Sequence, residues 1–347
     1  MKVLSIFDGI SCARVALERA GIHVEAYYAS EIDKYAIQIS KKNYPDIKQL
    51  GDVKKVGFNL LNKDAIEYGY GFSPIDIDLL IGGSPCQDLS IAKKNRKGLD
   101  GERSGLFWEY VRILNEVKPK YFILENVNSM PKEAKELITK TLGVEPIMIN
   151  ASLVSAQNRK RLFWVGKRVG LTVLEGKPYY EKVEIPQPED RGILLKDILE
   201  DKVDSAFCVA MRGRYLINGK RKDVFGAKTQ QCLEPNMSGK SNTLSTVSKD
   251  NLVYLGHINK SNGQANRVYL PEGKSVSLSA MSGGLGAKTG MYLIGENIRI
   301  LTPIECERLQ GLPDNYTEGI SPNQRRKVCG NAFNVDVVAH ILSFIPC

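Results

Sequence analysis

The chain has 347 residues, of which 43% are hydrophobic and 25% are charged, and it carries a net charge of +9. This composition indicates a globular protein with a packed core and excludes a disordered or collagen-like chain. Seven cysteines without a C-x-x-C pair and only three histidines argue against a disulfide framework or a zinc site. No apolar stretch approaches the roughly 18 residues of a membrane span. We expect no signal peptide, and a reducing compartment such as the cytoplasm.

The first half of the chain alternates short β-rich runs with helical stretches. This pattern predicts βαβ units and a doubly wound, mostly parallel sheet. The predicted strands are residues 3–7, 24–29, 79–81, 121–124, 145–149 and 162–165, and the predicted helices are residues 13–20, 34–43, 105–117 and 131–142. Residues 168–204 are expected to form a connector.

Residues 205–290 have a different character. Glycine is denser there, short β-prone pieces such as RVYLP (267–271) alternate with turns, and twelve Lys and Arg residues stand against four acids. Helical texture returns at 302–311 and 323–344. We therefore expect an α/β domain formed by residues 1–175 and 297–347. A β-rich insert with its connector, residues 176–296, separates these two parts. A basic run is often only a solvated surface, but a second one, KKNRK at 93–97, favours a polyanionic partner.

Acidic residues stand at the ends of the first predicted strands. Asp8-Gly9 follows the first strand, Glu31 the second, and Asp52 lies near the next strand end. Ligands of open α/β sheets bind at this edge, where an acid hydrogen-bonds ribose hydroxyls. No glycine-rich phosphate loop is present. Each acid alone is more often a helix cap or a surface charge, but together these features suggest a cofactor with a ribose and an adenine but no phosphate, such as S-adenosylmethionine. We expect Ser11 to cap the helix that follows Asp8-Gly9.

Cys86 follows the buried strand at 79–81, on a loop stiffened by Pro85. Taken by itself, this is either a half-buried bystander cysteine or a nucleophile. Glu125 follows the run 121–124, on a strand expected to be adjacent. A thiolate that attacks C6 of cytosine, with a protonated carboxyl group hydrogen-bonding N3, would leave C5 able to accept a methyl group. Residues 157–166 add Arg159 and Arg161, either surface arginines or ligands of a base carbonyl and a phosphate.

These motifs, with RILTPIECERLQGLPDNY at 299–316 and QRRKVCGNAFNVDVVAHIL at 324–342, resemble the DNA (cytosine-5-)methyltransferase family over nearly the whole chain. The loop GGSPCQDLS is similar to those of animal de novo and bacteriophage members. Many bacterial members have a glycine where Ser11 stands, so the turn after the first strand is expected to differ slightly in shape.

The resemblance implies the following site residues. Catalytic roles are expected for Cys86, Glu125, Arg159 and Arg161. Contacts with S-adenosylmethionine are expected from Phe7, Asp8, Gly9, Ile10, Ser11, Glu31, Ile32, Asp52, Val53, Ser84, Pro85, Leu106, Asn331 and Ala332. Contacts with DNA are expected from Gln87, Ser90, Lys93, Lys94, Arg96 and Lys97, while Arg299 is expected to support the recognition region. No metal is expected.

The resemblance further implies base flipping in duplex DNA, a target-recognition role for the basic insert, and a monomer on DNA. Three alternatives remain open: a transfer-RNA methyltransferase, a non-catalytic DNA-binding protein of the same fold, and a thiol oxidoreductase. The last lacks a resolving cysteine near Cys86. A cognate restriction endonuclease, a phage origin and a regulatory circuit are equally open.

Overall fold

The computed structural model describes residues 1–57, 76–83, 105–172, 176–200 and 302–346, together with the main chain of short strands between residues 208 and 298. It divides into two compact units, which we describe separately. The first contains Met1–Asn150, Lys160–Pro188 and Ala332–Cys347, and the second contains Ala151–Arg159 and Glu189–Asn331.

The first unit is built on one sheet. Its elements are β1 (Lys2–Ile6), α1 (Cys12–Arg19), β2 (Ala26–Ser30), α2 (Lys34–Asn43), β3 (Lys48–Gln49), the 3-10 turn η1 (Val53–Lys55), β4 (Leu79–Gly83), α4 (Leu106–Val117), β5 (Tyr121–Val127), α5 (Lys132–Leu142), β6 (Ile147–Asn150), β8 (Lys160–Leu171), β9 (Pro178–Lys182) and α8 (Val335–Leu342). The strand order is β3-β2-β1-β4-β5-β8-β6, with β9 paired to β8. Strands β1 to β5 pair in parallel, and β8 is antiparallel to its three neighbours. The sheet is therefore mostly parallel, as predicted.

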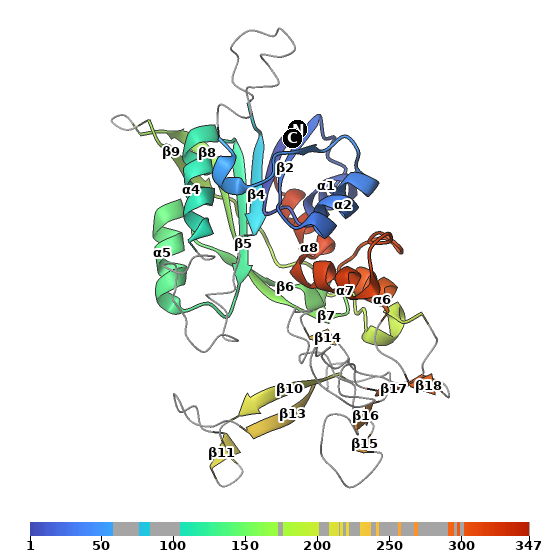
Figure 1. Ribbon diagram of the computed structural model, residues 1–347. Coiled ribbons are helices and arrows are strands. Elements are labelled where there is room, and N and C mark those ends of the chain that lie inside the picture. The colour runs from blue at the N-terminus through green and yellow to red at the C-terminus, as the bar shows by residue number, and fades with distance from the viewer. Residues whose placement is uncertain are drawn as a thin grey trace. The chain divides into compact units, whose positions relative to one another are not determined.

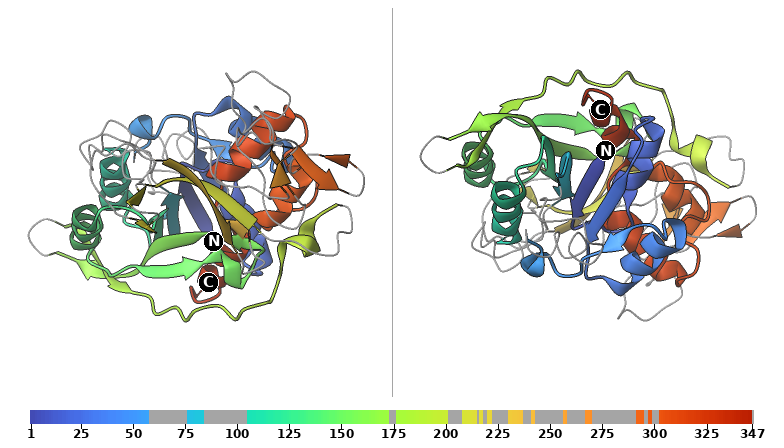
Figure 2. Two further views of the ribbon diagram at one scale, coloured as in Figure 1. Left: turned by 90° about the horizontal axis from the view of Figure 1, so that it is seen from below. Right: turned by 90° about the horizontal axis from the view of Figure 1, so that it is seen from above.

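Helices cover both faces of this sheet. Helices α4 and α5 lie on one face, and α1, α2 and α8 lie on the other (Figures 1 and 2). Leu80 of β4, Phe107 of α4 and Ile138 of α5 belong to one buried apolar cluster. Burial of such side chains is the main stabilising contribution to a fold of this kind. The unit is a doubly wound α/β domain.

The predicted elements match the first unit closely. Helix α2 begins and ends at the predicted residues. Its start is fixed by Asp33, whose carboxylate caps the helix by accepting hydrogen bonds from the N–H groups of Tyr35 and Ala36. The prediction of a connector at residues 168–204 was wrong in its first part. Residues 178–182, within the expected connector, form strand β9, and β8 continues to Leu171 to pair with it. Strand β9 is an edge strand with exposed residues such as Tyr179, so its sequence lacks the continuous apolar run that marks a buried strand.

The second unit contains mostly short elements. They are η3 (Ala151–Leu153), β7 (Gln157–Asn158), η4 (Leu195–Ile198), β10 (Cys208–Arg214), β11 (Leu216–Ile217), β12 (Lys220–Arg221), β13 (Gln230–Asn236), β14 (Ser241–Asn242), β15 (Gly256–His257), β16 (Arg267–Tyr269), β17 (Met291–Ile294), β18 (Asn297–Ile298), α6 (Pro303–Leu309) and α7 (Pro322–Asn331). Each element described between 208 and 298 is a strand, and β16 lies within the predicted β-prone piece RVYLP. Helix α6 begins with a capping box between Thr302 and Glu305.

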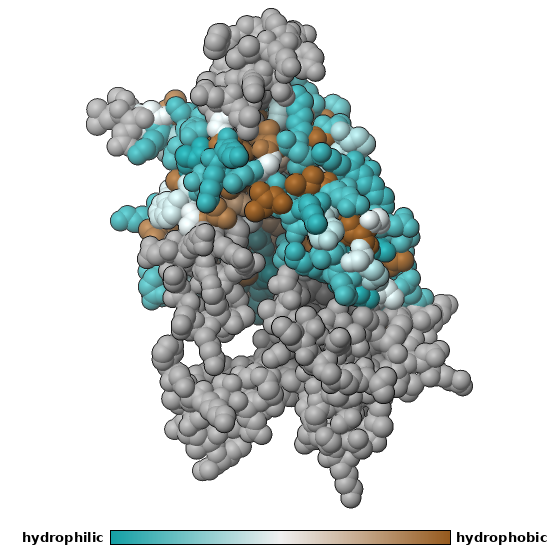
Figure 3. Space-filling model, viewed as in Figure 1, coloured by the Kyte–Doolittle hydropathy of each residue, from teal (hydrophilic) through white to brown (hydrophobic). Residues whose placement is uncertain are grey.

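The described surface on the face seen in Figure 3 is largely hydrophilic, with apolar residues in small groups. Within the described ranges, none of the helices has the length and apolarity that crossing a membrane requires. Ile32, at 75%, is the most exposed of the large apolar side chains in the described ranges.

Candidate active site

The parallel strands bring several of the predicted site residues, among them Asp8, Glu31 and Glu125, to one edge of the sheet. Strands β1, β2, β3, β4 and β5 all end there, and we call this the carboxyl edge. Gly83, the last residue of β4, pairs with Glu125 of β5. The expected adjacency of the strand that precedes Cys86 and the strand that carries Glu125 is confirmed.

The turn after β1 has an unusual backbone. Phe7, Gly9 and Ser11 have φ values of 56°, 61° and 60°, in the left-handed region that non-glycine residues seldom occupy. A Cβ atom added to Gly9 would meet no other atom within 4 Å. The main chain at Gly9 therefore faces open space, where a ligand can approach it closely.

Ser11 does not cap helix α1, contrary to our prediction. It occupies the N-cap position, but its left-handed backbone turns the side chain away from the helix N–H groups. The hydroxyl is fully buried and lies 2.5 Å from Asp8 Oδ2 and 2.7 Å from Ser40 Oγ. Because a hydroxyl carries one hydrogen, Ser11 donates to the Asp8 carboxylate and accepts from Ser40. Gln49 Nε2 in turn donates to Ser40 Oγ at 2.9 Å.

The carboxyl group of Asp8 faces the protein interior. It also accepts a hydrogen bond from the Tyr27 hydroxyl at 2.7 Å, and the residue is only 5% exposed. Burial raises the pKa of Asp8 from 3.8 to about 6, although the hydrogen bonds from Ser11 and Tyr27 oppose this shift. We therefore assign the Asp8 side chain to holding the turn, which leaves its main chain to face a ligand.

Glu31 fixes the end of β2. Its Oε2 accepts a hydrogen bond from Gly9 N at 2.8 Å, and its Oε1 accepts from the N–H groups of Ile32 and Asp33, both at 2.8 Å. A carboxylate offers about four acceptor positions, and three are used here, so one position remains, on Oε2, for a hydroxyl group. The exposed Ile32 side chain lies next in sequence. Ile10, in contrast, is buried in the core.

The turn that carries Asp52 and Val53 is held on several sides. Asp52 caps η1, its Oδ1 accepting from Lys54 N at 3.0 Å. Ser30 Oγ donates to Gly51 O at 2.7 Å. The Val53 side chain is buried in the cluster that includes helix α4, and Leu106, the first residue of α4, packs partly buried against the same cluster.

Glu125 and Arg161 form an ion pair at the end of β5. Arg161 Nε lies 2.8 Å from Glu125 Oε1, and both side chains are largely buried, at 15% and 13% exposure. Arg161, on β8, lies opposite Val127 of β5. It is therefore a diagonal neighbour of Glu125, which stands two residues earlier on β5. The pair fixes the carboxyl group at the carboxyl edge.

Gly83 leaves room beside this carboxyl group. A Cβ atom at Gly83 would lie 3.0 Å from Glu125 Oε2 and 2.8 Å from the Phe333 ring. Any larger residue would therefore displace one of these groups. Glu125 Oε2 thus lies directly beside the last residue of β4, three positions before Cys86 in the sequence.

Arg159 and Asn331 belong to the second unit, and Arg159 is buried there. Its Nη1 donates to the main-chain oxygen of Gly330 at 3.4 Å. Asn331 ends α7 and is exposed, whereas Ala332, in the first unit, is buried.

Several predicted site residues lie outside the described residues. They are Ser84, Pro85, Cys86, Gln87, Ser90, Lys93, Lys94, Arg96, Lys97 and Arg299. The assignments of these residues stay predictions.

Sequence reasoning missed four residues at the carboxyl edge: Tyr27, Ser40, Gly83 and Arg112. Gly83 carried a readable signal, since a glycine at a strand end indicates a close approach by another group. The other three act on groups far away in the sequence, and no local motif marks such contacts.

The chain matches the model of the family described as C-5 cytosine-specific DNA methylase over residues 1–347. It is 30% identical to the type II methyltransferase M.HhaI of Haemophilus parahaemolyticus, over 98% of this chain and 93% of that protein. It is also 30% identical to the orphan methyltransferase M.Rho11sI of Bacillus phage rho11s, over 93% of this chain and 66% of that protein.

Among solved structures, that of S. pombe Dnmt2 methyltransferase is similar in fold, with a TM-score of 0.56 at 16% identity over 99% of this chain and 97% of that one. The chain therefore belongs to the C-5 cytosine-specific DNA methylase family and is a DNA (cytosine-5-)-methyltransferase.

Proposed function

We propose that the chain methylates C5 of cytosine within a specific duplex DNA sequence, through addition of Cys86 to the flipped target base. The observation that carries this proposal is the position of Glu125. Arg161 holds one carboxyl oxygen, and the other lies beside Gly83, the residue from which the chain leads to Cys86. A carboxyl group and a thiol on neighbouring strand ends can contact opposite sides of one pyrimidine ring.

In this mechanism Cys86 acts as the nucleophile. Its thiolate forms a bond to C6 of cytosine, while Glu125 hydrogen-bonds N3 and so accommodates the electrons that move into the ring. After methylation of C5, loss of the C5 proton restores the double bond and releases the thiolate. Arg161 positions Glu125 during these steps, and we propose that Arg159 contacts the base or its phosphate.

The carboxyl edge fits S-adenosylmethionine, which supplies the methyl group when bound. Glu31 has one free acceptor position for a ribose hydroxyl, Ile32 offers an exposed apolar surface for the adenine ring, and Gly9 leaves the main chain open. Asp52 and Leu106 would complete the adenine end. Carboxylates at this edge disfavour a cofactor that carries phosphates.

Duplex DNA is the proposed substrate because of the charge on the insert. The excess of Lys and Arg in residues 205–290 would neutralise phosphates and set position, while loops within the insert read base edges. The domains are proposed at 1–175 and 297–347 for catalysis and at 176–296 for the connector and the recognition domain. The two named relatives come from different settings, a type II system and a phage, so no endonuclease is assigned as a partner.

The test is transfer of labelled methyl groups from S-adenosylmethionine to duplex DNA and, in parallel, to transfer RNA, with bisulfite sequencing of the DNA product. We expect incorporation into DNA at cytosines within one short sequence, no incorporation into transfer RNA, and no turnover by Cys86→Ser. Methylation of transfer RNA alone would favour the RNA enzyme. Undiminished turnover by the serine variant would refute the nucleophile.

A further inference from the structure

We infer that Arg112 of helix α4 is a positioning residue that sets the cofactor end of the carboxyl edge, by clamping the turn that carries Asp52 and Val53. The inference rests on the proposed use of S-adenosylmethionine and deepens it. Arg112 itself is not expected to touch the cofactor, because its donors are directed to protein groups.

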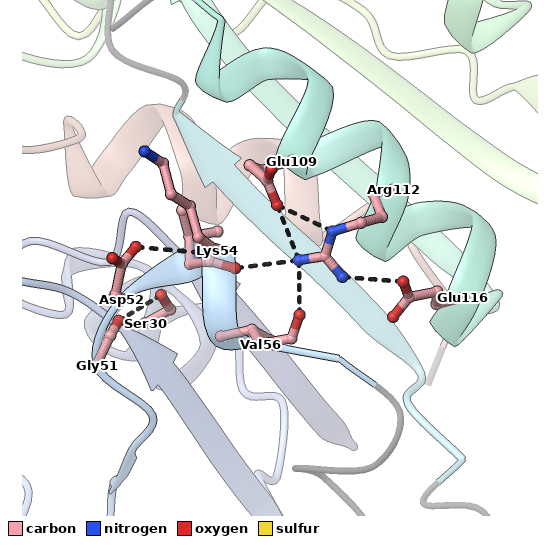
Figure 4. Close-up of polar contacts among 9 residues, drawn as sticks. Ser30, Gly51, Asp52, Lys54, Val56, Glu109, Arg112 and Glu116 are labelled. Atoms are coloured by element: carbon pink, nitrogen blue, oxygen red, sulfur yellow. Dashed lines mark hydrogen bonds and ion pairs between the residues drawn. The ribbon is translucent and has the colours of Figure 1, made fainter. Parts of the chain in front are cut away.

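The guanidinium group of Arg112 bridges two elements that are far apart in the sequence (Figure 4). Its Nη2 donates to the main-chain oxygens of Val53 at 3.2 Å and Val56 at 2.7 Å. These two carbonyls stand at either end of the η1 turn. A single nitrogen from α4 thus fixes both ends of the turn.

Two carboxylates of α4 aim this guanidinium group. Arg112 Nε donates to Glu109 Oε2 at 2.9 Å, and Nη1 donates to Glu116 Oε1 at 2.9 Å. Glu109 and Glu116 lie three residues before and four residues after Arg112, so all three share one face of the helix. Nε and Nη1 are held by the two glutamates, and Nη2, which also lies 2.9 Å from Glu109 Oε2, is directed to the carbonyl groups of η1.

The clamp should affect cofactor binding because it joins η1 and helix α4. Helix α4 begins at Leu106, and η1 follows Asp52, so the two linked segments are those that carry two predicted cofactor contacts. Ser30 Oγ holds Gly51 O from the side of β2, and Figure 4 shows this bond on the far side of the turn from Arg112. The turn is therefore fixed from β2 and from α4, and only the bond from α4 depends on a charged side chain.

Lysine cannot replace this arrangement. A guanidinium group presents five N–H donors in a plane, whereas an ammonium group is a single point with three donors. A lysine at this position would keep the positive charge near Glu109 and Glu116, but it could not hold both carboxylates and both carbonyls. The Arg112→Lys variant therefore tests the geometry of the clamp while it keeps the charge.

The experiment measures binding of S-adenosylhomocysteine by titration calorimetry, together with kcat and the KM for S-adenosylmethionine, for the full-length wild type and Arg112→Lys. We expect the Kd and the KM of the variant to rise about tenfold, as the loss of one or two charge-assisted hydrogen bonds implies. We expect kcat at saturating cofactor to stay within about twofold of wild type, because the contacts of Arg112 are with η1 and α4 and do not include Glu125.

Arg308→Lys is the matched control. Arg308 also donates to a carboxylate, Asp314, and to two main-chain oxygens, those of Ile198 and Leu199, but it lies in the second unit. This control variant should lower the melting temperature as Arg112→Lys does and leave the Kd for S-adenosylhomocysteine unchanged. If Arg112→Lys does not fold, Glu116→Gln frees one donor of the same clamp and is expected to raise the Kd about twofold to threefold.

A Kd for Arg112→Lys equal to that of wild type would overturn the inference. So would a parallel fall in kcat and in affinity that Arg308→Lys reproduces, since this indicates general destabilisation. A wild type that binds no S-adenosylhomocysteine would instead overturn the proposed cofactor, and the inference with it.

Discussion

The two halves of the carboxyl edge are built differently. At the ends of β1, β2 and β3, the carboxylates of Asp8, Glu31 and Asp52 already accept hydrogen bonds from nearby hydroxyl or main-chain N–H groups. At the ends of β4 and β5, Glu125 has a single described partner, Arg161, and it borders a glycine.

This difference separates two tasks. A cofactor site must have one shape before its ligand arrives, and many local hydrogen bonds provide that shape. In the mechanism that we propose, the site for the flipped base uses the open side of Glu125 together with Cys86. Variants of the first half should therefore change affinity for the cofactor, and variants of the second half should change turnover.

Glu125→Gln should have the largest effect. The amide keeps the size of the carboxyl group but cannot supply a proton to N3, so we expect kcat to fall roughly a thousandfold. The Kd for S-adenosylhomocysteine should stay within about twofold. Because Arg161 loses its carboxylate, the variant should also unfold at a lower temperature, and kinetics should be measured well below it. A loss of cofactor affinity as large as the loss of kcat would contradict the division of the edge.

Glu31→Gln should act on the other half. It weakens the bonds from Gly9, Ile32 and Asp33 and the proposed bonds to ribose, so we expect the Kd for S-adenosylhomocysteine to rise about 10-fold to 100-fold. kcat at saturating cofactor should change by less than about threefold. The control is Glu25→Gln, an exposed carboxylate paired with Lys2 at the opposite end of β2. Equal affinity of the Glu31 variant and this control would show that Glu31 does not bind the cofactor.

Asp8→Asn should have the smallest effect, and it should appear as a pH dependence. Because the pKa of Asp8 is raised from 3.8 to about 6 on folding, the folded protein holds this proton more tightly. The stability that results is full below pH 3.8 and is lost as the pH rises through about 6. Relative to Asp8→Asn, the wild type should gain about 1 kcal/mol of unfolding free energy between about pH 7.5 and about pH 5.

Asp78→Asn is a control for which the change of stability with pH has the opposite sign. Burial acts to raise the pKa of Asp78, but hydrogen bonds from Lys120 and from Lys2 N, with the charge of Lys120, outweigh it and lower that pKa. The wild type should therefore lose stability relative to Asp78→Asn as the pH falls toward 4. A wild-type advantage over Asp8→Asn that does not change with pH would mean that Asp8 does not titrate as described.

The sequence predicted the first unit well wherever local chemistry decides the structure. The start of helix α2 was predicted correctly because Asp33 is a strong N-cap, and Glu31 and Glu125 were located because parallel strands end at one edge. Strand β9 was missed since an edge strand with exposed residues such as Tyr179 and Glu181 lacks a buried pattern.

The remaining errors share a different cause. Ser11 was predicted to cap α1, yet its hydroxyl belongs to a network with Asp8, Ser40 and Gln49 that only the folded sheet assembles. Arg112 carried no signal because its acceptors are main-chain oxygens more than fifty residues away, at Val53 and Val56. Contacts of this kind follow from the tertiary fold and leave no motif.

The most direct measurement is capture of the covalent adduct between Cys86 and cytosine. Duplex DNA that contains 5-fluorocytosine at the bisulfite-mapped site is incubated with the wild type and S-adenosylmethionine, then digested and analysed by mass spectrometry. Fluorine at C5 cannot leave as a proton, so we predict that the modified nucleotide remains attached to the peptide that contains Cys86. An active preparation that yields no adduct, or one attached to a different cysteine, would contradict the account.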